Sequence, residues 1–331
     1  MSLTKEERRM WKEAIEARNG ERDFVRKLEH EQRLDRQRRQ GLFAPERERI
    51  WRQMQSLCDI DDARLTELVE QDTAAVQDFM EKQRTVIAEW AATVNQRQET
   101  LAQRAGAPQR LIGPPPQAGM VRRLLLKTAA DLSFTPSDNY VVEDEYELYG
   151  RKNFLGEWKN FIYLLAHTKP SNDAPIPPLL NANYVFRWTA DADVTVGAKT
   201  TPALVGMSSA FAGGGIDPTY AEARYYVSID IVVGTSTDTQ VYKGEVYTSP
   251  TRSAQTDWFD GLGAYDGGPI YDLPTVHVPA TAVAPAGSSV LFCVTITLDF
   301  FAFENSEALV DIFRDPSFYI NVGYVDVSIV S

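Results

Sequence analysis

The stretch DWFDGLGAYDGGPIYD at residues 257–272 gathers side chains that could bind a ligand. It contains four aspartates, four aromatic residues and four glycines. Carboxylates in a glycine-rich loop could coordinate calcium, and the candidate ligands here are Asp257, Asp260 and Asp266. Calcium loops place a ligand at about every second residue, and these aspartates do not follow that spacing. The spacing therefore favours another role for this stretch.

The aromatic residues of the same stretch suit a contact surface. The stretch lies between a predicted strand that ends near Thr248 and another that begins near Thr275, a connection of about 25 residues that is much longer than a hairpin loop. Aromatic side chains in such loops are common anchors of interfaces. We therefore predict an interface or binding surface formed by Trp258, Phe259, Tyr265 and Tyr271.

The histidines and cysteines do not form a local metal-binding motif. His30, His167 and His277 are far apart in the sequence, and no pair has the spacing of a motif such as H-E-x-x-H. Cys58 and Cys293 make neither a disulfide framework nor a set of metal ligands. We predict no cofactor.

Two stretches approach known catalytic motifs without matching them. Residues 206–210, GMSSA, have Ala where the nucleophile motif G-x-S-x-G requires its second Gly. Residues 261–267, GLGAYDG, place their last Gly one position beyond the dinucleotide-binding fingerprint. A carboxylate pair for glycoside hydrolysis cannot be recognised from spacing in a sequence. We therefore predict no catalytic residue and a protein that is not an enzyme.

The elements that must position these residues fall into two regions of different composition. Residues 1–110 contain two prolines and three glycines, whereas the remainder contains 16 prolines and 17 glycines. The proline-rich segment at 105–119 predicts a stiff, extended linker. We predict a helical oligomerisation or stalk region at 1–104, the linker at 105–119 and a β-sandwich domain at 120–331.

The apolar spacing before the linker predicts a long amphipathic helix that begins near an N-cap at Asp61. Its apolar period is nearer 3.6 than 3.5 residues, which favours a packed bundle or a loose coiled coil. The predicted contact residues of this helix are Leu65, Leu68, Phe79 and Trp90.

The first forty residues also have helical propensity, but they are densely charged. A second helix is expected to begin at Pro45 and to end near Cys58. Helices with so few apolar side chains to bury are not stable alone. We therefore predict that they pack against the helices of further copies of the chain, and that the assembly is a symmetric trimer. The sparse apolar stripe of the first helix consists of Met10, Ile15, Phe24, Val25, Leu28 and Leu34.

Alternating apolar residues after the linker predict strands. The most regular alternation lies at 289–301, and the alternation at 318–330 slips by one residue, which predicts a β-bulge near Gly323. Residues 304–315 are predicted to form a short helix. The remaining predicted strands lie at 140–148, 161–165, 183–188, 193–196, 225–233, 239–248 and 275–278. The predicted fold is therefore α+β and multidomain, with long N-terminal helices in a bundle or coiled coil followed by an antiparallel β-sandwich or jelly-roll-like domain.

The charge is divided unequally along the chain. Residues 1–110 contain 21 basic and 21 acidic residues, so all of the formal net charge of −12 lies after them. An acidic body repels nucleic acid, which we do not expect as a partner. The charged N-terminus, MSLTKEERRMWKEA, shows no secretory signal peptide, and no segment has the pattern of a transmembrane helix. We expect synthesis in the cytoplasm, with assembly into a virion or an extracellular structure.

The uncharged segment at 201–216, TPALVGMSSAFAGGGI, allows two interpretations. It could be the membrane-inserting loop of a pore-forming toxin, or a loop packed at a subunit interface or across the sandwich. The second interpretation is favoured.

These observations predict a non-enzymatic structural or interaction protein that assembles through its helical region and presents a β-sandwich, such as a capsid, spike, fibre or appendage subunit. The first alternative is an adhesin-like β-sandwich that binds a receptor or a glycan, and the second is the pore-forming toxin.

Overall fold

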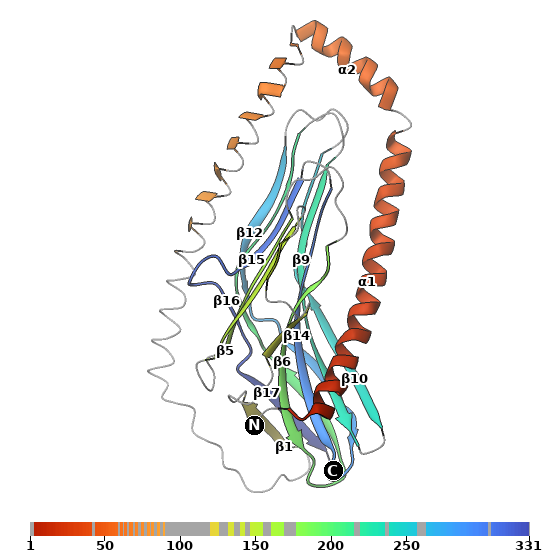
Figure 1. Ribbon diagram of the computed structural model, residues 1–331, viewed down its shortest axis with the longest axis vertical. Coiled ribbons are helices and arrows are strands. Elements are labelled where there is room, and N and C mark those ends of the chain that lie inside the picture. The colour runs from red at the N-terminus through yellow and green to blue at the C-terminus, as the bar shows by residue number, and fades with distance from the viewer. Residues whose placement is uncertain are drawn as a thin grey trace.

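The computed structural model describes residues 3–41, 44–58 and 60–61, isolated helical residues between 63 and 89, and most of the chain from 120 to 330. Within this last part, the structure leaves out 126–131, 136–139, 143–145, 155–159, 169–176, 215–218, 236–237, 257–262 and 304–305. Figure 1 shows one β-rich body with a long helix along its side.

Two helices precede the strands. Helix α1 (Lys5–Gly41) begins with a capping box, in which the Thr4 amide donates to Glu7 Oε2 at 2.8 Å and the Glu7 amide donates to Thr4 Oγ1 at 3.2 Å. Helix α2 (Ala44–Cys58) has Pro45 in its first turn, where a missing amide hydrogen costs nothing. In Figure 1, α1 follows the sandwich and α2 extends beyond its upper end.

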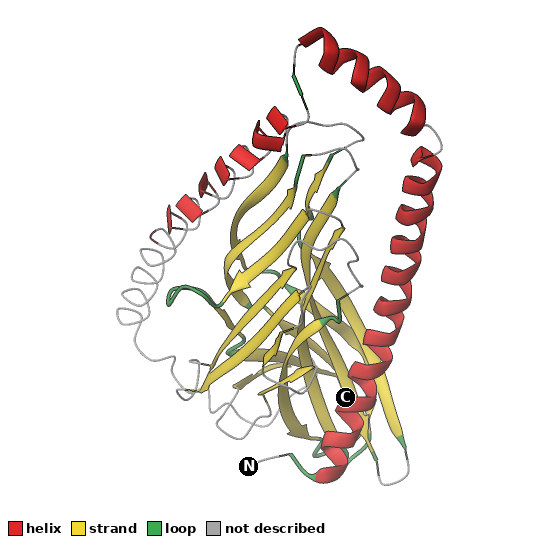
Figure 2. Cartoon of the chain, turned by 45° about the horizontal axis from the view of Figure 1, so that its top comes forward, coloured by secondary structure: helices red, strands yellow, loops and turns green. Residues whose placement is uncertain are grey.

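The strands form three antiparallel sheets, which we name sheets A, B and C. The order in sheet A is β1 (Met120–Leu125), β17 (Tyr324–Val330), β7 (Val194–Thr200) and β13 (Val276–Ala284). The order in sheet B is β10 (Thr239–Thr248), β9 (Tyr220–Gly234), β14 (Ser289–Phe303), β6 (Leu180–Thr189) and β2 (Leu132–Thr135), with β11 (Arg252–Gln255) on β9. The order in sheet C is β12 (Ala264–Asp272), β8 (Ala203–Ala212), β15 (Ser306–Ile312), β5 (Asn160–Thr168), β4 (Tyr146–Phe154) and β3 (Tyr140–Val142), with β16 (Tyr319–Asn321) on β5 and β8. Figure 2 shows these strands as one body with α1 along one side.

The core lies between the inner faces of the sheets. The even-numbered residues of β14 from Val290 to Phe300 belong to this core, as does the alternating set of β9 from Tyr225 to Val233. The strand prediction at 289–301 and 225–233 is therefore confirmed, including the division of each strand into two faces. The odd-numbered residues of β14 and the even-numbered residues of β9 form the outer face of sheet B.

The predicted helical bundle or coiled coil is wrong, because the body is mainly β and α1 packs on a sheet. The buried apolar residues of α1 form one cluster with residues of β6, β9 and β14. The outer face of a sheet in a β-sandwich is normally polar and exposed to solvent. A helix such as α1 would therefore find no apolar surface on that face to pack against. In this chain the outer face of sheet B carries apolar and acidic side chains that match the helix.

Three local predictions are also wrong. The predicted helix at 304–315 contains strand β15, whose alternating residues Ala308 and Val310 enter the core. The predicted loop at 201–216 contains the buried strand β8, between β12 and β15. The slip near Gly323 is not a bulge but the point where the chain leaves β16 in sheet C and enters β17 in sheet A.

The described helices end before residue 90 and the described strands begin at Met120. The predicted linker at 105–119 lies outside the described residues, so the domain division at 104 and 119 stays a prediction. Asp61 caps the next helical residues as expected, since its Oδ1 accepts from the Arg64 amide at 2.7 Å.

Candidate functional site

The first half of α1 docks on sheet B through apolar contacts. Met10 and Trp11 are 2% and 4% exposed, and they lie at the end of the sheet where the outer face is apolar. Gly234 at the end of β9 leaves room for Met10, since a Cβ there would lie 2.1 Å from the Met10 methyl group. The complete cluster consists of Leu3 just before α1, Met10, Trp11, Ala14 and Ile15 on α1, and Val185, Val232, Leu291 and Cys293 on the sheet.

From Arg18 onward, α1 docks through arginines that reach carboxylates of the same sheet face. Arg26 Nε lies 2.6 Å from Asp299 Oδ1 on β14, and Arg18 pairs with Asp230 on β9. These two arginines stand two turns apart, so they extend from the same side of the helix. We call this line of ion pairs between α1 and sheet B the seam.

Further pairs extend the seam along the helix. Arg33 Nη2 lies 2.5 Å from Glu222 Oε2, and Arg224 of β9 bonds Asp299 at 2.9 Å and Glu29 of α1 at 3.0 Å. Breaking an ion pair in which both partners are buried costs much more free energy than breaking a surface pair, because it leaves a buried charge without a partner.

The charges of the seam respond to burial. Burial raises the pKa of Asp230, although the neighbouring Arg18 guanidinium acts in the opposite direction. Burial raises the pKa of the Cys293 thiol as well. At Glu7, burial alone would raise the pKa, but hydrogen bonds from Ser289 and Thr4 and the charge of Arg187 outweigh it, so the pKa is lowered.

Exposed apolar side chains also lie on α1 and on one side of α2. On α1, Phe24 is 69% exposed, and Val25 and Leu28 lie beside it. On α2, Ile50, Met54 and Leu57 recur at one-turn spacing, and Leu57 is 86% exposed. We call these six side chains the outer helical surface.

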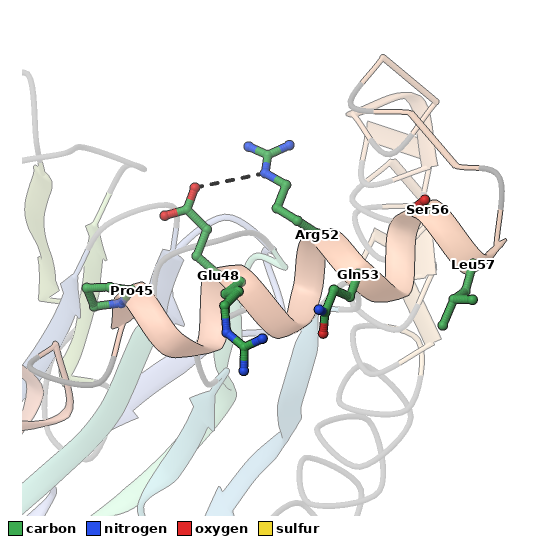
Figure 3. A pocket seen from close by; sticks show the side chains of 7 residues that line it. Pro45, Glu48, Arg52, Gln53, Ser56 and Leu57 are labelled. Carbon is green, nitrogen blue, oxygen red and sulfur yellow. Dashed lines mark ion pairs between the residues drawn. The ribbon is translucent and has the colours of Figure 1, made fainter.

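A groove of about 810 Å³ follows another side of α2. Its charged lining includes Glu48 and Arg52, whose carboxylate and guanidinium are 3.9 Å apart, as Figure 3 shows. Leu57 lies at the end of the groove and belongs to the outer helical surface as well. The residues that line the groove are Pro45, Glu48, Arg49, Arg52, Gln53, Ser56 and Leu57.

The structure brings two of the predicted contact residues together within the chain. The rings of Phe79 and Tyr265 pack edge to face with centroids 5.8 Å apart. Tyr265 lies over Gly267, where a Cβ would come within 2.1 Å of the phenol oxygen. Tyr271 on the same strand is 40% exposed and Leu68 is 38% exposed. The predicted contact residues Leu65, Trp90, Trp258 and Phe259 lie outside the described residues.

Of the three candidate calcium ligands, one lies in the described part of the chain and two lie outside it. Asp266 accepts a hydrogen bond from the Ser253 amide at 3.0 Å and lies 3.4 Å from Arg252 Nη1. Asp257 and Asp260 lie outside the described residues, so the calcium prediction is not tested. Within the described part of the chain, no group of three His, Cys, Asp or Glu side chains could hold a metal ion.

Two histidines have carboxylate neighbours. His167 Nε2 lies 2.7 Å from Glu307 Oε1, and its Nδ1 lies 3.9 Å from Glu147 Oε2. His277 Nδ1 lies 2.8 Å from Glu245 Oε2, on the exposed side of β13. These pairs link neighbouring strands, which is a structural role. The side chain of His30 is outside the described residues.

No family model and no curated protein matches this chain. Among solved structures, the enzymatically active domain of tailspike protein 4 from bacteriophage CBA120 is 8% identical, with a TM-score of 0.16, over 60% of this chain and 19% of that chain. TmCBM27, a carbohydrate-binding module with specific mannan recognition, is 11% identical, with a TM-score of 0.15, over 61% of this chain and 98% of that chain. Likenesses this low carry no argument about function.

The seam was missed from the sequence, although a signal for it exists. The arginines of α1 resemble an ordinary solvated helix face, since charged side chains are mostly exposed. Two features of the sequence, taken together, indicate that these arginines could pair with carboxylates of the sheet. The first fifty residues contain 14 basic and 11 acidic residues before an acidic body, and the second face of the predicted strands at 225–233 and 289–301 carries Asp230 and Asp299.

None of the described helices is long and apolar enough to cross a membrane.

Proposed function

We propose that the protein is a non-enzymatic structural or interaction protein that associates with further copies of itself through the outer helical surface. A subunit of a virion or an appendage is the kind of protein that this plan suits. The observation that carries the proposal is the exposure of Phe24 on α1 and of Leu57 on α2, at 69% and 86%. Large exposed apolar side chains that recur at one-turn spacing, as on α2, are typical of an interface.

The seam makes this surface suitable for assembly. Because Arg18 and Arg26 hold one side of α1 on the sandwich, the exposed apolar side chains of this helix are presented at a fixed orientation. A surface that is already ordered loses little conformational entropy when it binds.

The charged side chains of α2 pair within the helix, Glu46 with Arg49 and Glu48 with Arg52. A second copy is therefore proposed as the occupant because of the exposed apolar side chains, and charge complementarity plays no part in the choice. The predicted trimeric order stays a prediction, and a mass measurement decides it.

The test is the molar mass of the purified chain by light scattering at concentrations of tens of micromolar. The proposal expects a mass that is a multiple of the 37.1 kDa chain. A monomer over the whole concentration range would overturn it.

Glycan binding is the second candidate function, and the exposed ring of Tyr271 favours it. This side chain is 40% exposed on β12, which lies at the edge of the described sheet C, and exposed aromatic rings can stack on sugars. A glycan array with the wild-type chain and the Tyr271→Ala variant tests this function. It is contradicted if the array shows no binding and calcium does not change the melting temperature.

A further inference from the structure

Arg22 lies on α1 between two arginines of the seam, and it has no carboxylate partner within the described part of the chain. It follows Arg18 by one turn of α1 and precedes Arg26 by one turn. Its Nη1 donates to Thr297 Oγ1 at 2.6 Å, and its guanidinium carbon lies 4.8 Å from the ring centroid of Tyr226. Among the described residues, no ion pair includes Arg22.

The buried carboxylates of the seam are already engaged by other arginines. Asp230 pairs with Arg18, and Asp299 pairs with both Arg26 and Arg224. The third, Glu222, pairs with Arg33 and with Arg224. The guanidinium of Arg22 is therefore not neutralised by a direct partner.

Three buried donor groups without a hydrogen-bond partner lie next to this charge. They are Nε of Arg18, Nη2 of Arg22 and the hydroxyl of Ser228. The side chains of Arg18 and Ser228 are 7% and 0% exposed, respectively. Buried donors without partners are rare in proteins, and a water molecule or an ion between them is a common explanation.

The register of β9 places these donors together. Ser228 lies on the outer face of sheet B, between Asp230 and Tyr226 on the same strand. Arg18 pairs with Asp230 and Arg22 covers the ring of Tyr226, so Ser228 lies beneath the two arginines.

The electrostatics agree with this placement. Burial, followed by the nearby Arg18 charge, lowers the pKa of Arg22 to about 10, although Tyr226, Asp230 and Asp299 act in the opposite direction. A buried cation beside a second cation is destabilised until an anion neutralises it.

We propose that the seam binds a small monovalent anion of the chloride class between Arg18, Arg22 and Ser228. All three open groups can donate a hydrogen bond to an anion, and among the described residues no carboxylate contacts the Arg22 guanidinium directly. A water molecule could accept from the same donors, but it would leave the charge of Arg22 in place. The consequence is that the anion strengthens the docking of α1, independently of any assembly through the outer helical surface.

The test compares thermal melting of the full chain in sodium chloride and in sodium gluconate at one ionic strength. A ligand that binds only the folded state raises the melting temperature by mass action. Chloride is therefore expected to raise the melting temperature by roughly 2 °C, and the increase should level off once the site is saturated. The Arg22→Gln variant should lose this dependence. Arg9→Gln is the matched control, since Arg9 is an exposed arginine of the same helix, and it should keep the dependence.

Crystals of the wild-type chain soaked in bromide give a second readout that needs no variant. An anomalous peak between Arg18, Arg22 and Ser228 is the expected result. No peak together with no chloride dependence means that water fills the site and overturns the proposal. A peak without chloride dependence means an adventitious ion only, which contradicts it as well.

Discussion

Nε of Arg26 in helix α1 lies 2.6 Å from Oδ1 of Asp299 in strand β14, and both side chains are less than a tenth exposed. The two residues are separated by most of the chain, and their pairing fixes the helix on the outer face of sheet B. An ion pair of this kind is tolerated because each charge is satisfied by the other and by further hydrogen bonds: Arg26 also donates to the Pro177 carbonyl oxygen, and Asp299 also accepts from Arg224.

Replacing Arg26 by Met should destabilise the fold by about 3–5 kcal/mol, since Asp299 would then lose one partner of a buried pair. Because Arg224 still bonds Asp299 in this variant, we expect a loss of stability near the lower end of that range. Denaturant unfolding measures the change, and Arg9→Met is the control, because Arg9 pairs only on the helix surface. Equal unfolding midpoints for Arg26→Met and Arg9→Met would refute the buried pair.

The thiol of Cys293 should report whether α1 is docked. Cys293 is 1% exposed and belongs to the cluster beneath α1, whereas Cys58 is exposed. In a Cys58→Ser background, a thiol reagent should therefore modify Cys293 slowly in the otherwise unchanged chain and faster after Trp11→Ala. The control is Phe24→Ala, on the exposed side of α1, which should leave the rate unchanged. Rapid labelling without the Trp11 change would show that α1 does not cover this face.

Glu7 should make the docking of α1 sensitive to acid. Its folded-state pKa is lowered below the ordinary value of 4.5, so its stabilising contribution is complete above pH 4.5 and is lost as the pH falls through the folded pKa. The raised pKa of Asp230 acts in the opposite direction, so wild type alone does not isolate Glu7. The Glu7→Gln variant should be less stable by about 1–2 kcal/mol at pH 7.

The pH dependence of that difference is the measurement. Unfolding free energies of wild type and Glu7→Gln, determined from pH 7 down to pH 3, should converge below pH 4.5. A difference that stays constant over this range would show that Glu7 contributes through packing and not through its charge.

Phe79 and Tyr265 should be energetically coupled. Their edge-to-face contact predicts a coupling energy of about 0.5–1.5 kcal/mol in a double-mutant cycle with Phe79→Leu and Tyr265→Leu. The unfolding free energies of the four chains provide the value. Additive effects of the two changes would mean that the helical residues around Phe79 do not pack on β12 in solution.

The strands were predictable from the sequence because their apolar alternation is regular, and Val290 to Phe300 entered the core as expected. The docking of α1 was not predictable in the same way. Its partners Asp230 and Asp299 are polar positions of a strand face that would ordinarily meet water, so only their combination with the basic N-terminal residues hints at a covering helix, and the contact itself is seen in the structure.

Strand β15 shows a second limit of sequence patterns. Residues 304–315 contain good helix formers, yet Ala308 and Val310 fill the core and β15 pairs with β8 and β5 on either side. Pairing on both edges outweighs a weak local preference. Of the predicted contact residues, those outside the described part of the chain stay predictions.

The most direct test of the proposed assembly is the molar mass of three chains measured side by side by light scattering. The wild type should have a mass that is a multiple of 37.1 kDa, and Leu57→Glu on the outer helical surface should shift it towards a single chain. Leu273→Glu is the matched control, because Leu273 is an exposed leucine of the β-sandwich body, and it should keep the wild-type mass. A wild-type monomer, or equal masses for all three chains, would contradict the account.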